Sequence, residues 1–148
     1  MMNFFVSTPP NVLRAFNPAF PASSIPSRKG KNASDPSTAP SIGSWALSRA
    51  ILTGLGLAAR FVAILGGDSL PARKPDPAGL EQLRALTATA RERMLLVGDS
   101  GIDLRTARAG GVAFCGVAWG LAPEALAEAG AGRIIAHPRE LVAVVEGG

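Results

Sequence analysis

The pattern of hydrophobic and polar positions changes at about residue 44. Residues 1–43 hold seven of the twelve prolines, at positions 9, 10, 18, 21, 26, 36 and 40. Such spacing excludes a long helix or a central strand. After residue 44, short continuous apolar runs alternate with stretches in which apolar residues recur every three or four positions. The pattern predicts a disordered or loosely attached leader, residues 1–43, followed by a folded domain.

The periodic stretches of that domain predict helices at residues 45–53, 76–87, 102–109, 123–129 and 138–145. The continuous apolar runs predict strands at residues 61–65, 94–97, 113–118 and 133–136. Strands that alternate with helices at this spacing favour parallel strands joined by crossovers, with both faces of the sheet covered. The sequence therefore predicts an α/β fold. In such folds, ligands bind beyond the carboxyl ends of the strands.

Composition and charge limit the functions open to this chain. A hydrophobic share of 47% in 148 residues, with 17 Gly, suits one modest globular domain with many turns. There is no run of eighteen apolar residues that would predict a membrane-spanning helix. The net charge of +4 comes from residues 1–60, which carry six basic residues against one acidic, whereas residues 61–148 carry nine against ten. We therefore expect neither a nucleic acid nor a membrane as partner.

The chain has one cysteine and one histidine. Cys115 excludes an intramolecular disulfide and any multi-cysteine metal site. It lies in the apolar run 113–117, which predicts a buried, inert thiol. His137 precedes Pro138 in a predicted loop, and we expect it to be a surface histidine.

Two aspartates follow the strand predicted at residues 94–97. Asp99 comes directly after the strand, at its carboxyl end, and Asp103 comes four residues later, in the first turn of the next helix. Gly98 and Gly101 allow the backbone to turn tightly there. Two carboxylates at this place suit Mg²⁺, because water molecules and phosphate oxygens can complete the coordination of the ion. The spacing equally suits a structural role, in which Asp103 caps the helix and Asp99 holds the turn.

Lys74 lies immediately before a predicted helix, within Arg73-Lys74-Pro75-Asp76-Pro77. A lysine beside the N–H groups of a helix start forms an anion site, which the helix dipole assists. The two prolines stiffen the backbone that carries it. The alternative is a solvated lysine in a surface loop.

The order of these motifs resembles the haloacid dehalogenase-like phosphatases. The text ILTGLGLAARFVAILGGDSLPARKPDPAGL, followed by LLVGDSGIDLRTARAGGVAFCGVAWG, is most similar to phosphoglycolate phosphatases, and the resemblance spans residues 45–142. It implies a partial Rossmann-like parallel sheet with flanking helices, so that residues 44–148 form the carboxyl-terminal half of a core domain. It also implies a cytoplasmic, Mg²⁺-dependent phosphomonoester hydrolase that converts 2-phosphoglycolate, a small phosphorylated metabolite, to glycolate and phosphate.

The resemblance implies a role for each candidate residue. Lys74 would neutralise charge on the nucleophile and on the transferring phosphoryl group. Asp99 would bind Mg²⁺, and Asp103 would bind it or orient its waters. The family mechanism is attack by an aspartate on phosphorus, followed by hydrolysis of the phosphoaspartyl enzyme by water. The register also places Ser41 where the family has a serine or threonine that grips the phosphoryl group, although the residues before Ser41 are not strand-like.

Asp68, in Gly66-Gly67-Asp68-Ser69, matches a familiar family position as well. A role in forming the turn is at least as good an interpretation of this aspartate.

The first part of the family pattern has no counterpart in these 148 residues. The family begins with a strand that ends in Asp-x-Asp-x-Thr, but Asp35 has neither a second aspartate after it nor an apolar strand before it. The 44 residues before Trp45 are also too few for that strand and the substrate-selecting cap domain. The alternative to an enzyme is therefore a catalytically inactive fragment that binds phosphate and Mg²⁺ or regulates a partner.

Two further expectations follow from the missing half. A sheet without its first strand exposes an apolar edge, through which the chain could associate with a partner or with itself. Residues 1–43 are best interpreted as a non-native start, translated from the wrong upstream region. Their lack of acidic residues before Asp35, together with their Arg and Ser content, also fits an organellar transit peptide.

Overall fold

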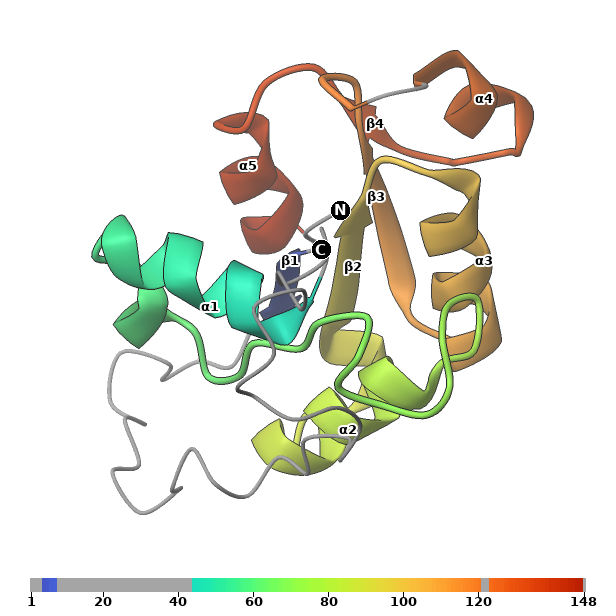
Figure 1. Cartoon of the computed structure of the whole chain (residues 1–148). Helices are drawn as coiled ribbons and strands as arrows, with labels where there is room; N and C mark the ends of the chain where they lie inside the picture. Colours follow the sequence, from blue (N-terminus) through green and yellow to red (C-terminus); the bar gives the residue numbers. More distant parts are fainter. Residues whose placement is uncertain (1–3, 8–43, 121–122, 148) are drawn as a thin grey trace. The chain divides into compact units, whose positions relative to one another are not determined.

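The computed structural model describes residues 4–7, 44–120 and 123–147. These residues belong to two compact units (Figure 1). The first unit contributes residues 44–73, and the second contributes residues 4–7 together with the chain from Lys74 onward. Within the described residues, every helix is too short or too polar to span a membrane.

The first unit is built on helix α1, Trp45–Gly54, which confirms the helix predicted at residues 45–53. Ser44 provides the N-cap, because its hydroxyl accepts a hydrogen bond from the Leu47 N–H at 3.3 Å. A short 3₁₀ helix, η3, Ala58–Arg60, follows. The strand predicted at residues 61–65 is wrong: none of these residues belongs to a strand. Most of them are only half-buried, and none is paired in the described sheet.

A turn at residues 66–69 packs against the start of α1. The Asp68 carboxylate accepts a hydrogen bond from the Trp45 N–H at 2.7 Å, and the Ser69 hydroxyl accepts one from the Gly66 N–H at 2.8 Å. A Cβ added to Gly66 would collide with the Trp45 backbone nitrogen, so only glycine allows this close approach. Asp68 therefore holds the turn and satisfies the first N–H group of the helix.

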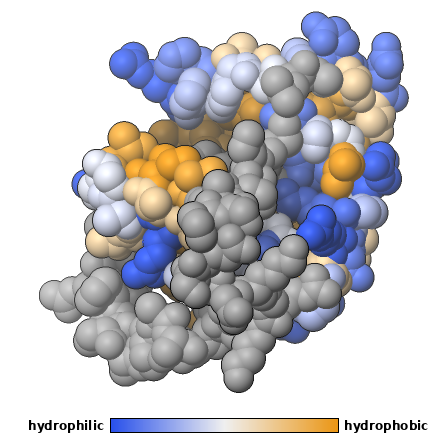
Figure 2. All heavy atoms as spheres, in the orientation of Figure 1, coloured by the Kyte–Doolittle hydropathy of each residue, from blue (hydrophilic) through white to orange (hydrophobic). Residues whose placement is uncertain are grey.

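The first unit also exposes several large hydrophobic side chains. Figure 2 shows hydrophobic residues gathered on the surface over α1 and the segment that follows it. The exposed members of this group are Ile51, Leu55, Leu57 and Val62. These exposed apolar side chains form a hydrophobic patch on the described part of the unit.

The second unit contains a four-stranded sheet in the order β1-β2-β3-β4. Strands β2, Met94–Gly98, β3, Ala113–Val117, and β4, Ile134–Ile135, are parallel and confirm the three strands predicted after residue 90. Strand β1, Phe4–Ser7, lies antiparallel to β2, with Phe4 opposite Val97. Sequence analysis did not predict this strand, which lies within the leader. It gives β2 a neighbour on both sides.

Four helices accompany the sheet at the positions predicted from periodicity. They are α2, Ala78–Thr87, α3, Gly101–Gly110, α4, Pro123–Glu128, and α5, Glu140–Glu146. Helix α2 begins at Ala78 because the Asp76 carboxylate accepts a hydrogen bond from the Ala78 N–H at 2.8 Å. Helix α3 ends at Gly110 and is capped by Gly111, whose φ of 63° lies in the left-handed region that favours glycine.

Alternating residues of β2 bury side chains on opposite faces of the sheet, as the strand period requires. Met94 and Leu96 pack with Leu80 of α2 and Ala107 of α3. On the other face, Val97 packs with Cys115 of β3, and side chains of α5 cover this cluster. Figure 1 shows α3 and α5 on opposite sides of the strands. The sheet is therefore covered on both faces, as its continuous apolar strands predict.

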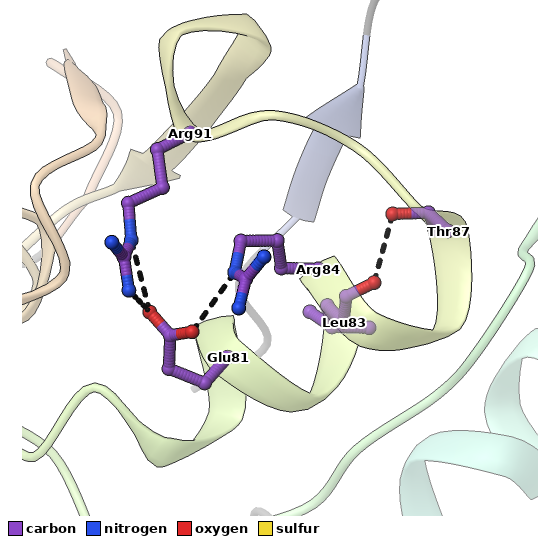
Figure 3. A network of polar contacts seen from close by, with 5 residues as sticks. All are labelled: Glu81, Leu83, Arg84, Thr87 and Arg91. Carbon is purple, nitrogen blue, oxygen red and sulfur yellow. Dashed lines mark hydrogen bonds and ion pairs between the residues drawn. The ribbon is translucent and has the colours of Figure 1, made fainter.

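An ion-pair network fixes α2 to the chain that leads into β2 (Figure 3). The Glu81 carboxylate accepts hydrogen bonds from Arg91 Nη2 at 2.7 Å and from Arg84 Nε at 2.9 Å. The hydrogen bond from Arg91 and, to a smaller extent, the one from Arg84 lower the pKa of Glu81 below its ordinary value of 4.5. Arg91 lies in a short 3₁₀ helix, η4, Arg91–Arg93, directly before β2. The network therefore holds α2 against the segment that leads into β2.

Candidate functional site

The candidate site lies at the carboxyl ends of β2 and β3. Gly98, the last residue of β2, is in register with Gly116 of β3, so both strands end at the same edge of the sheet. Asp99 and Ser100 follow β2, and residues 118–120 follow β3. Sequence analysis predicted the site at this edge, because parallel strands bring the loops after them together.

Asp103 is the best-anchored acidic residue of the site. Its carboxylate oxygen Oδ1 accepts a hydrogen bond from Lys74 Nζ at 2.9 Å, and Oδ2 accepts one from the Ser100 hydroxyl at 2.6 Å. The carboxylate is buried, with 2% of the side chain exposed, whereas 41% of the Lys74 side chain is exposed. Two donors compensate for much of the cost of burying this charge. The lysine side chain is thus partly exposed, whereas its counter-ion is buried.

Ser100 links Asp103 to the start of α3. It is the N-cap residue, and its hydroxyl oxygen accepts a 3.4 Å hydrogen bond from the Asp103 N–H while its proton goes to the Asp103 carboxylate. Sequence analysis missed this contact. The signal was present as Ser-x-x-Asp, which resembles a capping box at a helix start. Asp103 therefore contributes to the helix start and also binds Lys74, so the structural and functional interpretations of this residue are compatible.

Lys74 lies four residues before α2, and its peptide bond to Pro75 is cis. Its side chain reaches Asp103 across 29 positions of sequence. The structure thus brings together two of the candidate residues: Lys74 lies in an exposed loop, as the alternative interpretation expected, and is also bound to Asp103.

Asp99 has different surroundings. Its side chain is half-buried, and no residue in the described part of the chain donates a hydrogen bond to its carboxylate or forms an ion pair with it. A glycine from the loop after β3 lies directly against it: a Cβ added to Gly120 would collide with the Asp99 Cβ and lie 2.8 Å from Oδ2. Gly98 makes a similar space for Asp103, because a Cβ there would lie 2.8 Å from Cγ of Asp103. Each carboxylate is therefore placed against a glycine.

These oxygens can be compared with the needs of a divalent cation. Across residues 4–7, 44–120 and 123–147, no three or more His, Cys, Asp or Glu residues are grouped in a way that could hold a metal ion. Mg²⁺ needs no such group, since it takes one or two carboxylates and completes its octahedron with water and phosphate oxygens. Asp99 fits this requirement because it offers a hard oxygen ligand with no protein partner among the described residues. Asp103, held by Lys74 and Ser100, fits better as a residue that accepts hydrogen bonds from coordinated water.

The remaining candidates lie elsewhere. Ser41 lies outside the described residues. Cys115 is fully buried in β3, as predicted, and burial raises the pKa of its thiol. His137 is exposed, as predicted. Its ring nitrogen Nδ1 accepts a hydrogen bond from the backbone N–H of Arg139 at 3.2 Å, and its backbone N–H donates one to Glu140 Oε1 at 2.8 Å. The histidine therefore helps to begin α5 and takes no part in the site.

Comparison with known proteins agrees with this geometry. The family model of haloacid dehalogenase-like hydrolases matches residues 45–117. A phosphoglycolate phosphatase of Rhodospirillum rubrum is 43% identical over 84 residues, which are 57% of this chain and 35% of that protein. A phosphoglycolate phosphatase of Cereibacter sphaeroides is 54% identical over 68 residues, which are 45% of this chain and 30% of that protein. This chain thus spans about a third of the length of these relatives.

A solved structure shows the same fold. The crystal structure of a predicted phosphoglycolate phosphatase from Haemophilus somnus superposes with a TM-score of 0.60 at 30% identity, covering 65% of this chain and 43% of that one. The matched family segment includes Lys74, Asp99 and Asp103, the residues that form the site. Residues 45–117 therefore match the haloacid dehalogenase-like hydrolase family, and the relatives that resemble this chain bear the name phosphoglycolate phosphatase.

Proposed function

We propose that this chain contributes the Mg²⁺- and phosphate-binding part of a phosphomonoester hydrolase, with 2-phosphoglycolate as its substrate. One observation carries the proposal: the ammonium of the partly exposed Lys74 side chain, held at 2.9 Å by a buried carboxylate, lies at the sheet edge where the half-buried Asp99 carboxylate has no partner among the described residues. The names of the relatives supply the substrate. A cytoplasmic location rests on the resemblance alone.

The side chains divide the work by charge. Lys74 offers a positive charge to the phosphoryl oxygens, and Asp103 fixes its position so that little reorganisation is needed when the substrate arrives. Asp99 would hold Mg²⁺, with Asp103 orienting its waters. When bound, the ion would supply charge neutralisation at the phosphoryl oxygens. Phosphoryl transfer depends mainly on such positioning and electrostatic stabilisation.

The test is Mg²⁺-dependent release of phosphate from 2-phosphoglycolate and from an aryl phosphate by the full 148-residue chain. Asp99→Asn and Lys74→Ala should abolish the release, whereas Arg73→Ala, which removes the neighbouring cation, should leave it unchanged. Release that survives both site variants would show either a contaminating phosphatase or a different site, and would contradict the proposal.

A second candidate is a binding or regulatory module without turnover. The observation that favours it is the lack of any Asp-x-Asp-x-Thr pattern in these 148 residues. This module would still be stabilised by its ligand, by about 2.7 kcal/mol at a Mg²⁺ concentration one hundred times Kd. A Mg²⁺-dependent rise in melting temperature that Asp99→Asn removes, without phosphate release, would identify this function. Association through a sheet edge stays a prediction, for which sedimentation velocity is the direct measurement.

A further inference from the structure

We propose that Gly120 is a positioning residue for Asp99, and that its missing side chain determines how the Asp99 carboxylate is presented to a divalent cation. The inference deepens the proposed function and rests on it. Gly120 lies three residues beyond the end of β3, and Asp99 lies one residue beyond the end of the neighbouring parallel strand β2. Nothing in the sequence separation of the two residues indicates that they touch.

Gly120 lies in direct contact with the Asp99 side chain. A Cβ on Gly120 would overlap the Asp99 Cβ and would also lie 3.0 Å from Cγ and 2.8 Å from Oδ2. A side chain at position 120 would therefore press on the base and on the charged end of Asp99 together. Rotation of the carboxylate alone cannot relieve a clash with Cβ, so either the Asp99 side chain and its backbone or the loop after β3 must move.

The backbone conformation of Gly120 does not itself require glycine. Gly111 and Gly130 have positive φ values, which explain their identity as glycine, but Gly120 is not among the residues with positive φ. An alanine could adopt the backbone conformation of Gly120. The need for glycine at this position is therefore a need for space, and the space is filled by Asp99.

The chain offers matched variants and an internal reporter. Gly132 also has no positive φ and has no atom within 4 Å of an added Cβ, so Gly132→Ala is the control. Trp119, half-exposed beside Gly120, reports on this loop. The protein contains no tyrosine and one other tryptophan, Trp45, so a Trp45→Phe background isolates the Trp119 emission.

The experiment is a Mg²⁺ titration of the full chain, followed by Trp119 fluorescence and by calorimetry. We expect Gly120→Ala to weaken Mg²⁺ binding by about 10-fold or more, the effect of losing a residue that orients a metal ligand. Gly132→Ala should change it by less than about twofold. An unchanged affinity in Gly120→Ala, while Asp99→Asn loses binding, would overturn the inference and leave the proposed function standing. No binding by the parent chain would overturn both.

A double-mutant cycle tests the contact without metal. Gly120→Ala should lower the urea unfolding midpoint of the parent chain but not that of an Asp99→Gly chain, in which the obstructing side chain is absent. An equal decrease in both backgrounds would show that Gly120 stabilises the loop independently of Asp99, and would overturn the positioning role.

Discussion

Replacing Lys74 with methionine removes the ammonium but keeps most of the aliphatic stem, and leaves the buried Asp103 carboxylate without this partner. Breaking a fully buried ion pair costs about 3–5 kcal/mol, and losing a hydrogen bond to a charged group costs about 1.5–3 kcal/mol. Because 41% of the Lys74 side chain is exposed, solvent already screens part of this interaction, and the lower range applies. We expect Lys74→Met to destabilise the chain by about 2 kcal/mol.

The assay is urea unfolding at neutral pH, followed by far-UV circular dichroism. With a slope of about 2 kcal/mol per molar urea, a loss of about 2 kcal/mol lowers the midpoint by about 1 M. Asp103→Asn should remove the charge that Lys74 compensates. In that background, Lys74→Met should cost at least about 1 kcal/mol less than in the parent chain.

Arg73→Met is the control, because this neighbouring cation is exposed and forms no ion pair with a described residue. It should change the free energy of unfolding by no more than about 0.5 kcal/mol. The reasoning is refuted if Lys74→Met costs no more than Arg73→Met, or if it costs the same with and without the Asp103 charge.

Three further predictions concern residues outside the site. The lowered pKa of Glu81 contributes stability that is present above pH 4.5 and is lost as the pH falls through the folded-state pKa, so acid titration of Glu81→Gln should lack this loss. The buried Cys115 thiol should resist an aromatic disulfide reagent in the native chain and react once urea unfolds it. Because burial raises the pKa of this thiol, the free energy of unfolding should fall above about pH 9, and Cys115→Ala should remove that fall. Leu126→Ala should lower the free energy of unfolding by about 2–5 kcal/mol in urea titration, because this side chain is fully buried, and a loss below about 1 kcal/mol would contradict its place in the core.

The sequence predicted those elements whose signals are local. Strand β2 is a continuous apolar run, and helix α3 has an apolar period ended by a glycine pair, so each was predicted within one residue at either end. The apolar run at 61–65 does not form the predicted strand, because a continuous apolar run indicates burial but not that a neighbouring strand is available for pairing. Most of this segment is only half-buried, and none of it belongs to a strand of the described sheet.

The contacts that the sequence could not reveal are those between distant segments. Strand β1 has only four residues, and its partner lies near position 97, so no local pattern marks it. Lys74 and Asp103 were both predicted as site residues, Lys74 from its place before a helix start and Asp103 from its place after a strand, but their ion pair depends on how α2 packs. The approach of Gly120 to Asp99 depends on the path of the loop after β3, and a glycine in a loop has many possible causes.

The pairing of β1 with β2 has a consequence for the order in which the sheet forms. Strands β2, β3 and β4 follow one another with a single helix between neighbours, so their pairing closes short loops. Joining Phe4 to Val97 closes a loop of nearly two thirds of the chain, at a larger entropic cost. Contacts of such high sequence separation slow folding when they must form early. The parallel strands can therefore assemble first and offer an edge to which residues 4–7 add last.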